Sequence, residues 1–258
     1  MTDTEAMRLV SIGDSFTEGV GDELPGGTPR GWADLLAGGL ARHLGEPVEY
    51  ANLAIRGRLA GQIVDEQLEP ALALEPTALT FNGGGNDLMR LRADLDRLRA
   101  LTEHVILRCL ENGVRPIILS GGNPSGGLPM GRRIQRLGDL LTVVARELTA
   151  RYDVAFADNW SDAELARADY WSDDRLHLNT AGHHRVAARV LTTLGASYPP
   201  AWMAPAGAAR TAPGLAENVR YYRRYVAPWV RRRLTGRSSG DHRTAKFLDW
   251  TVVGPLDP

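Results

Sequence analysis

A serine near the amino terminus stands in a setting that favours nucleophilic chemistry. Residues 13–19 read Gly-Asp-Ser-Phe-Thr-Glu-Gly and follow directly on an apolar run, 9–12, that predicts a β-strand. A serine at the end of a parallel strand lies at the sheet edge where ligands bind, and flanking glycines allow a sharp turn there. Taken alone the segment is a weak signal, because Asp14 with Ser15 is also typical of a helix cap.

A nucleophilic serine needs a base, and the base needs a group that orients it. Asp174 precedes His177 by three residues, so within one turn of chain its carboxylate can accept a hydrogen bond from one imidazole nitrogen while the other faces the serine. Asp173 is the alternative to Asp174 in this role. His183 and His184 are expected to belong to the start of the last helix.

Attack on a carbonyl also needs hydrogen-bond donors for the oxyanion that forms. Gly57, after the second predicted strand, offers a backbone N–H at close range, and Asn86, after the third, offers a side-chain amide. The alternative for the triple glycine 83–85 is a phosphate-binding nest. Leu88 interrupts a complete Gly-x-Gly-x-x-Gly pattern and no lysine follows, which argues against that alternative.

The elements that would position these residues alternate between short apolar runs and segments of helical period, which is typical of an α/β fold with a parallel sheet. The predicted strands are 9–12, 48–53, 78–82, 114–120 and 154–157. The apolar stripes predict helices over 32–44, 88–105, 134–148 and 186–194. Right-handed crossovers bring the carboxyl ends of such strands to one edge. Two Gly-rich loops, 19–31 and 121–131, are expected near that edge, either as pocket walls, as a mobile lid or as plain surface connections.

Composition excludes several other classes of function. A single cysteine, Cys109, excludes a disulfide framework and a cysteine-built zinc site. A single lysine, Lys246, argues against both a P-loop and a Schiff-base enzyme. The net charge of −1 gives no general attraction to nucleic acid. Neither a signal peptide nor an apolar run long enough to span a membrane is visible, so we expect a cytoplasmic protein.

The charge is distributed unevenly along the chain. Residues 199–258 hold ten basic and four acidic residues, a net charge of +6, which leaves −7 for residues 1–198. We therefore expect a catalytic domain over 1–198 and a basic, partly helical C-terminal extension over 199–258. An apolar stripe in the extension is expected to pack on the chain's own acidic domain or on a partner subunit, with anionic lipid or nucleic acid as the alternative; it comprises Leu215, Val219, Tyr222 and Val226.

Taken together, Ser15, Gly57, Asn86 and His177 resemble the four invariant positions that name the SGNH hydrolases, also called the GDSL esterase and lipase family. The first block matches in full, the third reads Gly-x-Asn-Asp and the last reads Asp-x-x-His-Leu-Asn-x-x-Gly-His. The second block departs from the pattern at Ala54, where many members carry glycine. The resemblance covers roughly residues 7–195 and leaves the extension outside it.

This resemblance implies a three-layer α/β/α fold with a five-stranded parallel, flavodoxin-like sheet and no metal or organic cofactor. It implies Ser15 as the nucleophile, His177 as the base and Asp174 as the carboxylate that orients it. The N–H groups of Ser15 and Gly57 and the amide of Asn86 would form the oxyanion hole. The expected activity is hydrolysis of a small or medium acyl ester, or an acetyl ester, through an acyl-enzyme.

Other functions remain open on the sequence alone. The same triad serves an acyltransferase, and the domain could be a non-catalytic interaction module that docks through its basic extension. A metal-dependent hydrolase is a more distant reading, with the ligands Asp173, Asp174, His177, His183 and His184. The expected partner is a small-molecule ester, with no nucleic acid, and with a possible homo-oligomer or surface contact through residues 199–258.

Overall fold

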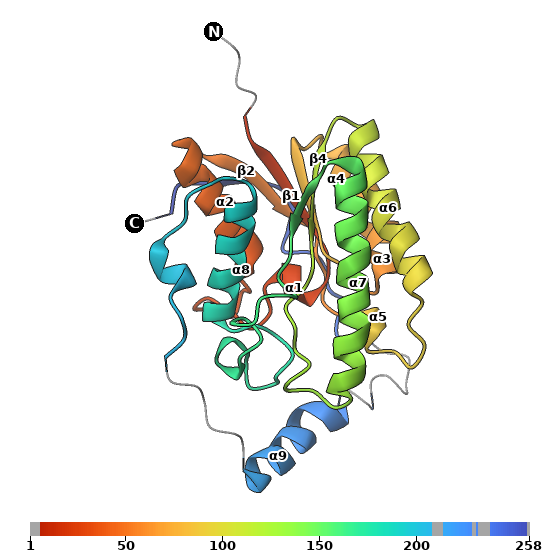
Figure 1. Ribbon diagram of the computed structural model, residues 1–258. Coiled ribbons are helices and arrows are strands. Elements are labelled where there is room, and N and C mark those ends of the chain that lie inside the picture. Colours follow the sequence, from red (N-terminus) through yellow and green to blue (C-terminus); the bar gives the residue numbers. More distant parts are fainter. Residues whose placement is uncertain (1–5, 208–213, 229–230, 232–237, 257–258) are drawn as a thin grey trace.

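A mostly parallel sheet lies at the centre of the computed structural model, which describes residues 6–207, 214–228, 231 and 238–256 (Figure 1). Its strand order is β5-β4-β3-β1-β2-β6. Strands β1 to β5 are parallel to their neighbours, whereas β6 runs antiparallel to β2. The strands are β1 (Arg8–Ile12), β2 (Val48–Asn52), β3 (Ala78–Phe81), β4 (Arg115–Leu119), β5 (Ala155–Ala157) and β6 (Phe247–Val253).

All five predicted strands are present, and each begins and ends within one residue of its predicted bounds. Continuous apolar runs are typical of parallel strands that are covered on both faces. Strand β1 is the clearest case, because Leu9, Val10 and Ile12 alternate between the two faces and are all fully buried. The sixth strand, β6, was not predicted. It is a half-exposed edge strand whose polar and apolar residues mix, so it lacks the continuous apolar run of the others.

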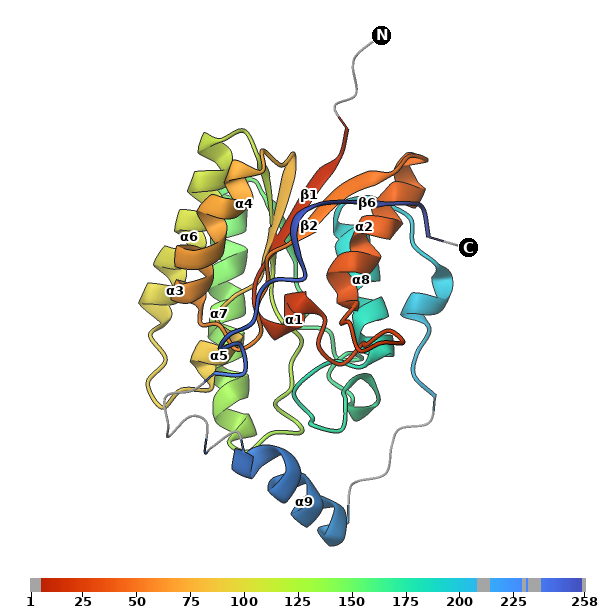
Figure 2. The same cartoon turned by 180° about the vertical axis from the view of Figure 1, so that it is seen from behind.

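Helices cover both faces of the sheet, which confirms the three-layer α/β/α fold (Figures 1 and 2). One face packs against α2 (Gly31–Leu44) and α8 (Thr180–Thr193). The other packs against α3 (Ala60–Ile63), η1 (Val64–Leu68), α4 (Glu69–Ala73), α6 (Leu95–Glu111) and α7 (Gly131–Tyr152). The short elements are α1 (Ser15–Glu18), α5 (Gly85–Leu88), η2 (Ala168–Tyr170), η3 (Pro200–Met203), α9 (Leu215–Tyr221) and η4 (Tyr222–Val226).

One predicted helix is wrong in its bounds. The stripe from residue 88 to 105 predicted a single helix, but α5 ends at Leu88 and α6 begins only at Leu95. The side chain of Asp94 accepts a hydrogen bond from the backbone N–H of Arg97 and so caps α6 there. Leu91, which fitted the stripe, lies in the connection between the two helices and is 89% exposed.

The C-terminal extension, residues 199–258, contributes η3, α9, η4 and β6. The structure does not describe residues 1–5 or, within the extension, residues 208–213, 229–230, 232–237 and 257–258. Most of the apolar stripe does not pack on the chain's own domain, because Leu215, Val219 and Tyr222 are 83%, 46% and 49% exposed. Packing on a partner subunit, the other half of the prediction, stays a prediction. Tyr221, which the stripe skipped, is the buried residue of α9. The buried face of α9 is therefore the one that carries Tyr221, next to the predicted stripe.

Lys246 attaches the extension to the domain just before β6. Its buried ammonium group lies 2.7 Å from the carboxylate of Asp34. It also donates to the carbonyl oxygens of Glu18, Pro29 and Arg30 at 2.7 to 3.1 Å. The single lysine of the chain thus joins the extension to the end of α1 and to the segment that precedes α2. Within the described ranges, no helix is both long and apolar enough to cross a membrane.

Candidate active site

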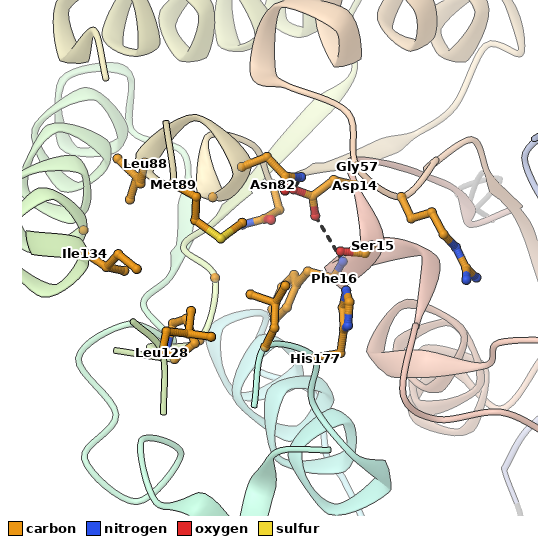
Figure 3. Close-up of a pocket in the computed structure, with 18 of the residues that line it drawn as sticks. Asp14, Ser15, Phe16, Gly57, Asn82, Leu88, Met89, Leu128, Ile134 and His177 are labelled. Atoms are coloured by element: carbon orange, nitrogen blue, oxygen red, sulfur yellow. Dashed lines mark hydrogen bonds between the residues drawn. The ribbon is translucent and has the colours of Figure 1, made fainter. Parts of the chain in front are cut away.

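Ser15 begins α1 at the point where β1 leaves the carboxyl edge of the sheet (Figure 3). The turn before it is fixed from two sides. The carboxylate of Asp14 accepts a hydrogen bond from the backbone N–H of Phe16 at 3.0 Å. The buried amide of Gln67 accepts from the N–H of Gly13 at 2.9 Å and donates to the carbonyl of Gly13 at 3.0 Å. The half-buried serine is therefore carried on a turn with little freedom to move.

Asp174 and His177 form the predicted pair. His177 Nδ1 donates to Asp174 Oδ2 at 2.6 Å, and Asp174 Oδ1 accepts the backbone N–H groups of Leu176 and His177, each at 3.0 Å. Burial opposes ionisation of Asp174, but these hydrogen bonds and the charge of the imidazole outweigh it and hold the pKa of Asp174 below its usual value. Figure 3 shows His177 directed toward Ser15. The carboxylate thus orients the ring toward the serine.

Asp173, the alternative to Asp174, and the two neighbouring histidines lie outside the Asp174–His177 pair. Asp173 is exposed. His183 lies in α8 as predicted and is fully buried, where its ring accepts from the N–H of Trp32 at 3.1 Å and donates to the carbonyl of Val20 at 3.2 Å. Burial lowers the pKa of His183 to about 4. His184 stacks on Trp202.

The metal-dependent reading fails on the positions of its ligands. Both ring nitrogens of His183 are bonded to backbone groups, which leaves neither of them for a metal. Among the residues that the structure describes, no three His, Cys, Asp or Glu side chains are grouped so that they could hold a metal ion.

Gly57 lies in the segment after β2, and α1 holds this segment in place. Glu18 at the end of α1 accepts the backbone N–H of Arg56 at 2.7 Å and forms an ion pair with the Arg56 guanidinium. Gly57 has a φ of +78°, in the left-handed region that favours glycine. The segment 56–58 is thereby anchored to the helix that carries Ser15, and Ala54 in place of the family's glycine leaves this anchor intact.

Asn86 follows β3 and connects two of these segments. Its amide Nδ2 donates to Asp14 Oδ2 at 2.9 Å and to the carbonyl oxygen of Arg58 at 3.0 Å. Asp14 is buried, which raises the pKa of its carboxyl group to about 6; the hydrogen bond from Phe16, the charge of His177 and the bond from Asn86 offset this only in part. The amide therefore lies between the serine turn and the Gly57 segment.

A cavity of about 820 Å³ brings all five predicted site residues together, since Ser15, Gly57, Asn86, Asp174 and His177 all line it. One side of the cavity carries apolar side chains, which Figure 3 shows as Leu88, Met89, Leu128 and Ile134, while Arg90, Thr102 and Thr142 are among the polar residues that also line the cavity. The Gly-rich loop 121–131 supplies part of its wall, whereas loop 19–31 contributes only Val20 within the same cavity.

Several residues that shape the site escaped the sequence analysis. Gln67 and Glu18 act through buried bonds to residues far away in the chain, for which a single sequence gives no spacing signal. Asp14 was noted only as a helix cap. The extension also lines the cavity, through Tyr221, Ser238 and other residues of its described parts. A polar residue inside an apolar helical stripe, as at Gln67, is the one sequence signal that could have revealed these supporting residues.

Residues 11–185 match the GDSL-like lipase/acylhydrolase family. The chain belongs to this family. It is accordingly a hydrolase of carboxylic esters, with the three-layer α/β/α fold that the resemblance implied. Residues 186–258, which include the whole extension, lie outside the matched segment.

Solved structures show the same GDSL-type fold at low sequence identity. A variant of Axe2, an acetyl xylan esterase from Geobacillus stearothermophilus, is 21% identical and matches with a TM-score of 0.62 over 75% of this chain and 96% of its own. TesA is 23% identical, with a TM-score of 0.60 over 73% of this chain and 98% of its own. LAE5, an α/β hydrolase from the metagenome of Lake Arreo in Spain, is 22% identical, with a TM-score of 0.60 over 74% and 96%. No curated protein matches the chain.

Proposed function

We propose that this chain hydrolyses small or medium acyl esters through a covalent acyl-enzyme on Ser15. One observation carries the proposal: Ser15 and the bonded pair Asp174–His177 line the same cavity, with the imidazole directed toward the serine. A hydroxyl, a base that faces it and a carboxylate that orients the base are the parts that nucleophilic acyl transfer needs.

In the first half of the proposed reaction, Ser15 Oγ attacks the carbonyl carbon of the ester while His177 Nε2 takes the hydroxyl proton. The carbonyl oxygen becomes an oxyanion that accepts hydrogen bonds from the N–H groups of Ser15 and Gly57 and from the Asn86 amide. To donate to it, Asn86 Nδ2 releases its bond to Asp14 or to the Arg58 carbonyl oxygen, because these two acceptors use both of its hydrogens. As the tetrahedral intermediate collapses, the bond to the alcohol oxygen breaks, and His177 returns the proton to the leaving alcohol. Asp174 stabilises the imidazolium that forms between these steps.

In the second half, water attacks the acyl group on Ser15. His177 takes a proton from the water, and the same three donors hold the second oxyanion. Collapse breaks the bond to Ser15 Oγ, which regains its proton from His177 and releases the carboxylic acid. Added alcohols would take the place of water in an acyltransferase, so the ratio of transfer to hydrolysis is part of the test.

The lining of the cavity supports an apolar acyl group as its occupant. Besides the polar donors near Ser15, the cavity is lined by apolar side chains from α5, α7 and the loop between β4 and α7. Burial of one CH₂ group contributes about 0.8 kcal/mol, so a chain of several carbons gains affinity in such a cavity. We propose that the acyl chain points away from Ser15 toward Leu128 and Ile134.

The catalytic residues all lie in residues 1–198, which we propose as the catalytic domain. Residues 199–258 add β6 to the sheet edge and contribute to the cavity wall. In this proposal the domain carries out the reaction, and the extension supports the sheet edge and the cavity wall.

Hydrolysis of p-nitrophenyl esters of graded chain length tests the proposal. The intact protein is expected to release nitrophenol from acetate through octanoate, and Ser15→Ala is expected to lose this activity. Ser161→Ala removes an exposed hydroxyl away from the cavity and serves as the matched control. Full activity in Ser15→Ala would show that another residue is the nucleophile.

A further inference from the structure

A turn of the C-terminal extension, Ser238–Asp241, lies directly against the segment that carries Gly57. The Ser238 hydroxyl donates to the carbonyl oxygen of Gly57 at 3.2 Å. The approach is close, because a Cβ atom added to Gly57 would lie 2.4 Å from Ser238 Oγ and 2.8 Å from Ser239 Oγ. The extension therefore covers the side of Gly57 on which any other residue would carry a side chain.

Gly240 of the same turn touches the preceding peptide group. A Cβ atom added to this buried glycine would lie 2.1 Å from the carbonyl oxygen of Arg56. The turn is itself fixed, because the N–H of Gly240 donates to Ser238 Oγ at 3.2 Å and the N–H of Ser238 donates to Asp241 Oδ2 at 2.8 Å. Ser238 thus binds both Gly240 and Gly57 through one hydroxyl group.

The position of Gly240 has a direct consequence for the N–H of Gly57. A peptide group is planar and trans, so the carbonyl of Arg56 and the N–H of Gly57 belong to one rigid plane and point in opposite directions. The described part of the chain contains no cis peptide bond. A group that presses on the Arg56 oxygen therefore turns the Gly57 N–H by the same angle.

We propose that Ser238 and Gly240 of the extension are positioning residues that hold the Gly57 N–H in line with the oxyanion. The inference rests on the proposed role of Gly57 as a donor. Glu18 fixes the preceding peptide group through the N–H of Arg56, and Ser238 fixes the following one through the carbonyl oxygen of Gly57. The peptide group between them, which carries the Gly57 N–H, is contacted directly by Gly240. Both contacts from the extension come from residues outside the segment that matches the family.

Gly240→Ala is the first test. The added methyl group pushes on the Arg56 carbonyl and tilts the Gly57 N–H, which we expect to lower kcat for p-nitrophenyl butyrate by about 10- to 100-fold with KM changed less than about twofold. Gly254→Ala is the matched control, because it lies in the same extension and a Cβ atom added there meets nothing within 4 Å. Its kcat is expected to equal that of the unaltered protein.

Binding of an alkyl boronic acid separates a misplaced donor from a general structural effect. The boronic acid forms a tetrahedral adduct with Ser15 Oγ, and one of its oxygens occupies the place of the oxyanion. If Gly240→Ala misplaces the donor, the inhibition constant rises by about the same factor as kcat falls. A lower kcat with an unchanged inhibition constant would overturn the proposal, as would a kcat equal to that of Gly254→Ala.

Ser238→Ala and Ser238→Thr keep the proposal testable if Gly240→Ala does not fold. The alanine variant removes the hydrogen bond to the Gly57 carbonyl, and we expect about a 3- to 10-fold loss of kcat, equivalent to one ordinary hydrogen bond. The threonine variant keeps the hydroxyl and is expected to recover most of the loss. Equal kcat in the unaltered protein and in both Ser238 variants would overturn the proposal. Failure of the proposed function itself would appear differently, as full activity in Ser15→Ala.

Discussion

The Asp14 carboxylate accepts a hydrogen bond of 2.9 Å from the Asn86 side-chain amide, directly beside Ser15. Asp14 is buried, and burial raises its pKa to about 6. The bond connects the turn that carries the proposed nucleophile with a proposed oxyanion donor. The protonation state of Asp14 therefore affects two parts of the site at once.

Asp14 is expected to make the free energy of unfolding depend on pH. Its folded pKa of about 6 lies above the value of 3.8 for an unperturbed group, so the folded state holds the proton more tightly. The resulting stabilisation is full below about pH 3.8 and is lost as the pH rises through 6, a change of about 2 kcal/mol between pH 4 and pH 7. Asp14→Asn should lack this contribution. Urea unfolding of both proteins at the two pH values measures it, and an identical pH dependence in both would contradict it.

Asp174→Asn is expected to lower kcat by about 10²- to 10⁴-fold with little change in KM, because the amide no longer stabilises the imidazolium or fixes the ring tautomer. Asp173→Asn changes the neighbouring, exposed carboxylate and is expected to keep full activity. Steady-state kinetics on p-nitrophenyl butyrate compare the two variants. If both variants lost activity equally, the pairing of Asp174 with His177 would not be the cause.

Leu128→Trp is expected to shorten the preferred acyl chain. The larger ring fills the apolar end of the cavity, so kcat/KM for an octanoate ester should fall by about 10-fold or more while that for an acetate ester changes less than about twofold. Leu91→Trp adds the same ring at a site that is 89% exposed and does not line the cavity. An equal loss on both esters in Leu128→Trp would place the acyl chain elsewhere.

Lys246→Met is expected to lower the free energy of unfolding by about 3–5 kcal/mol, since it leaves the carboxylate of Asp34 buried without its cation. The three carbonyl oxygens that now accept from Lys246 would also lose a donor. The double variant Lys246→Met/Asp34→Asn should recover part of the loss. Urea unfolding of the three variants measures both effects, and a cost for Lys246→Met below about 1 kcal/mol would mean that the pair contributes like an exposed one.

The fold and the proposed catalytic residues could be predicted from the sequence because their signals are local. Strands buried on both faces are continuous apolar runs, and Asp174 lies three residues from its partner. Ser15, Gly57 and Asn86 follow successive strands, and the parallel topology alone brings them to one edge. Pairing of distant segments gives no such signal: β6 pairs with β2 across about 200 residues of chain, and Ser238 lies 181 residues from Gly57.

The apolar stripe of the extension shows where periodicity misleads. Leu215 and Val219 fit a helical stripe, yet they face solvent while Tyr221 is buried. Tyr221 packs under the guanidinium of Arg175, whose carbon lies 4.1 Å from the ring centroid, and Arg175 also bonds to Asn218 at 3.0 Å. The contact between the Tyr221 ring and Arg175, next to the Asp174–His177 pair, holds α9 in place. A hydropathy pattern does not predict such a contact.

Labelling with a p-nitrophenyl alkylphosphonate tests the central claim, that Ser15 is the nucleophile, most directly. Attack by Ser15 Oγ on phosphorus expels one p-nitrophenolate and leaves a stable tetrahedral phosphonyl group on the serine. Peptide mass spectrometry is expected to find one phosphonyl group per chain, on the peptide that contains Ser15, and none in Ser15→Ala. A phosphonyl group on any other residue, or esterase activity that survives complete labelling, would contradict the account.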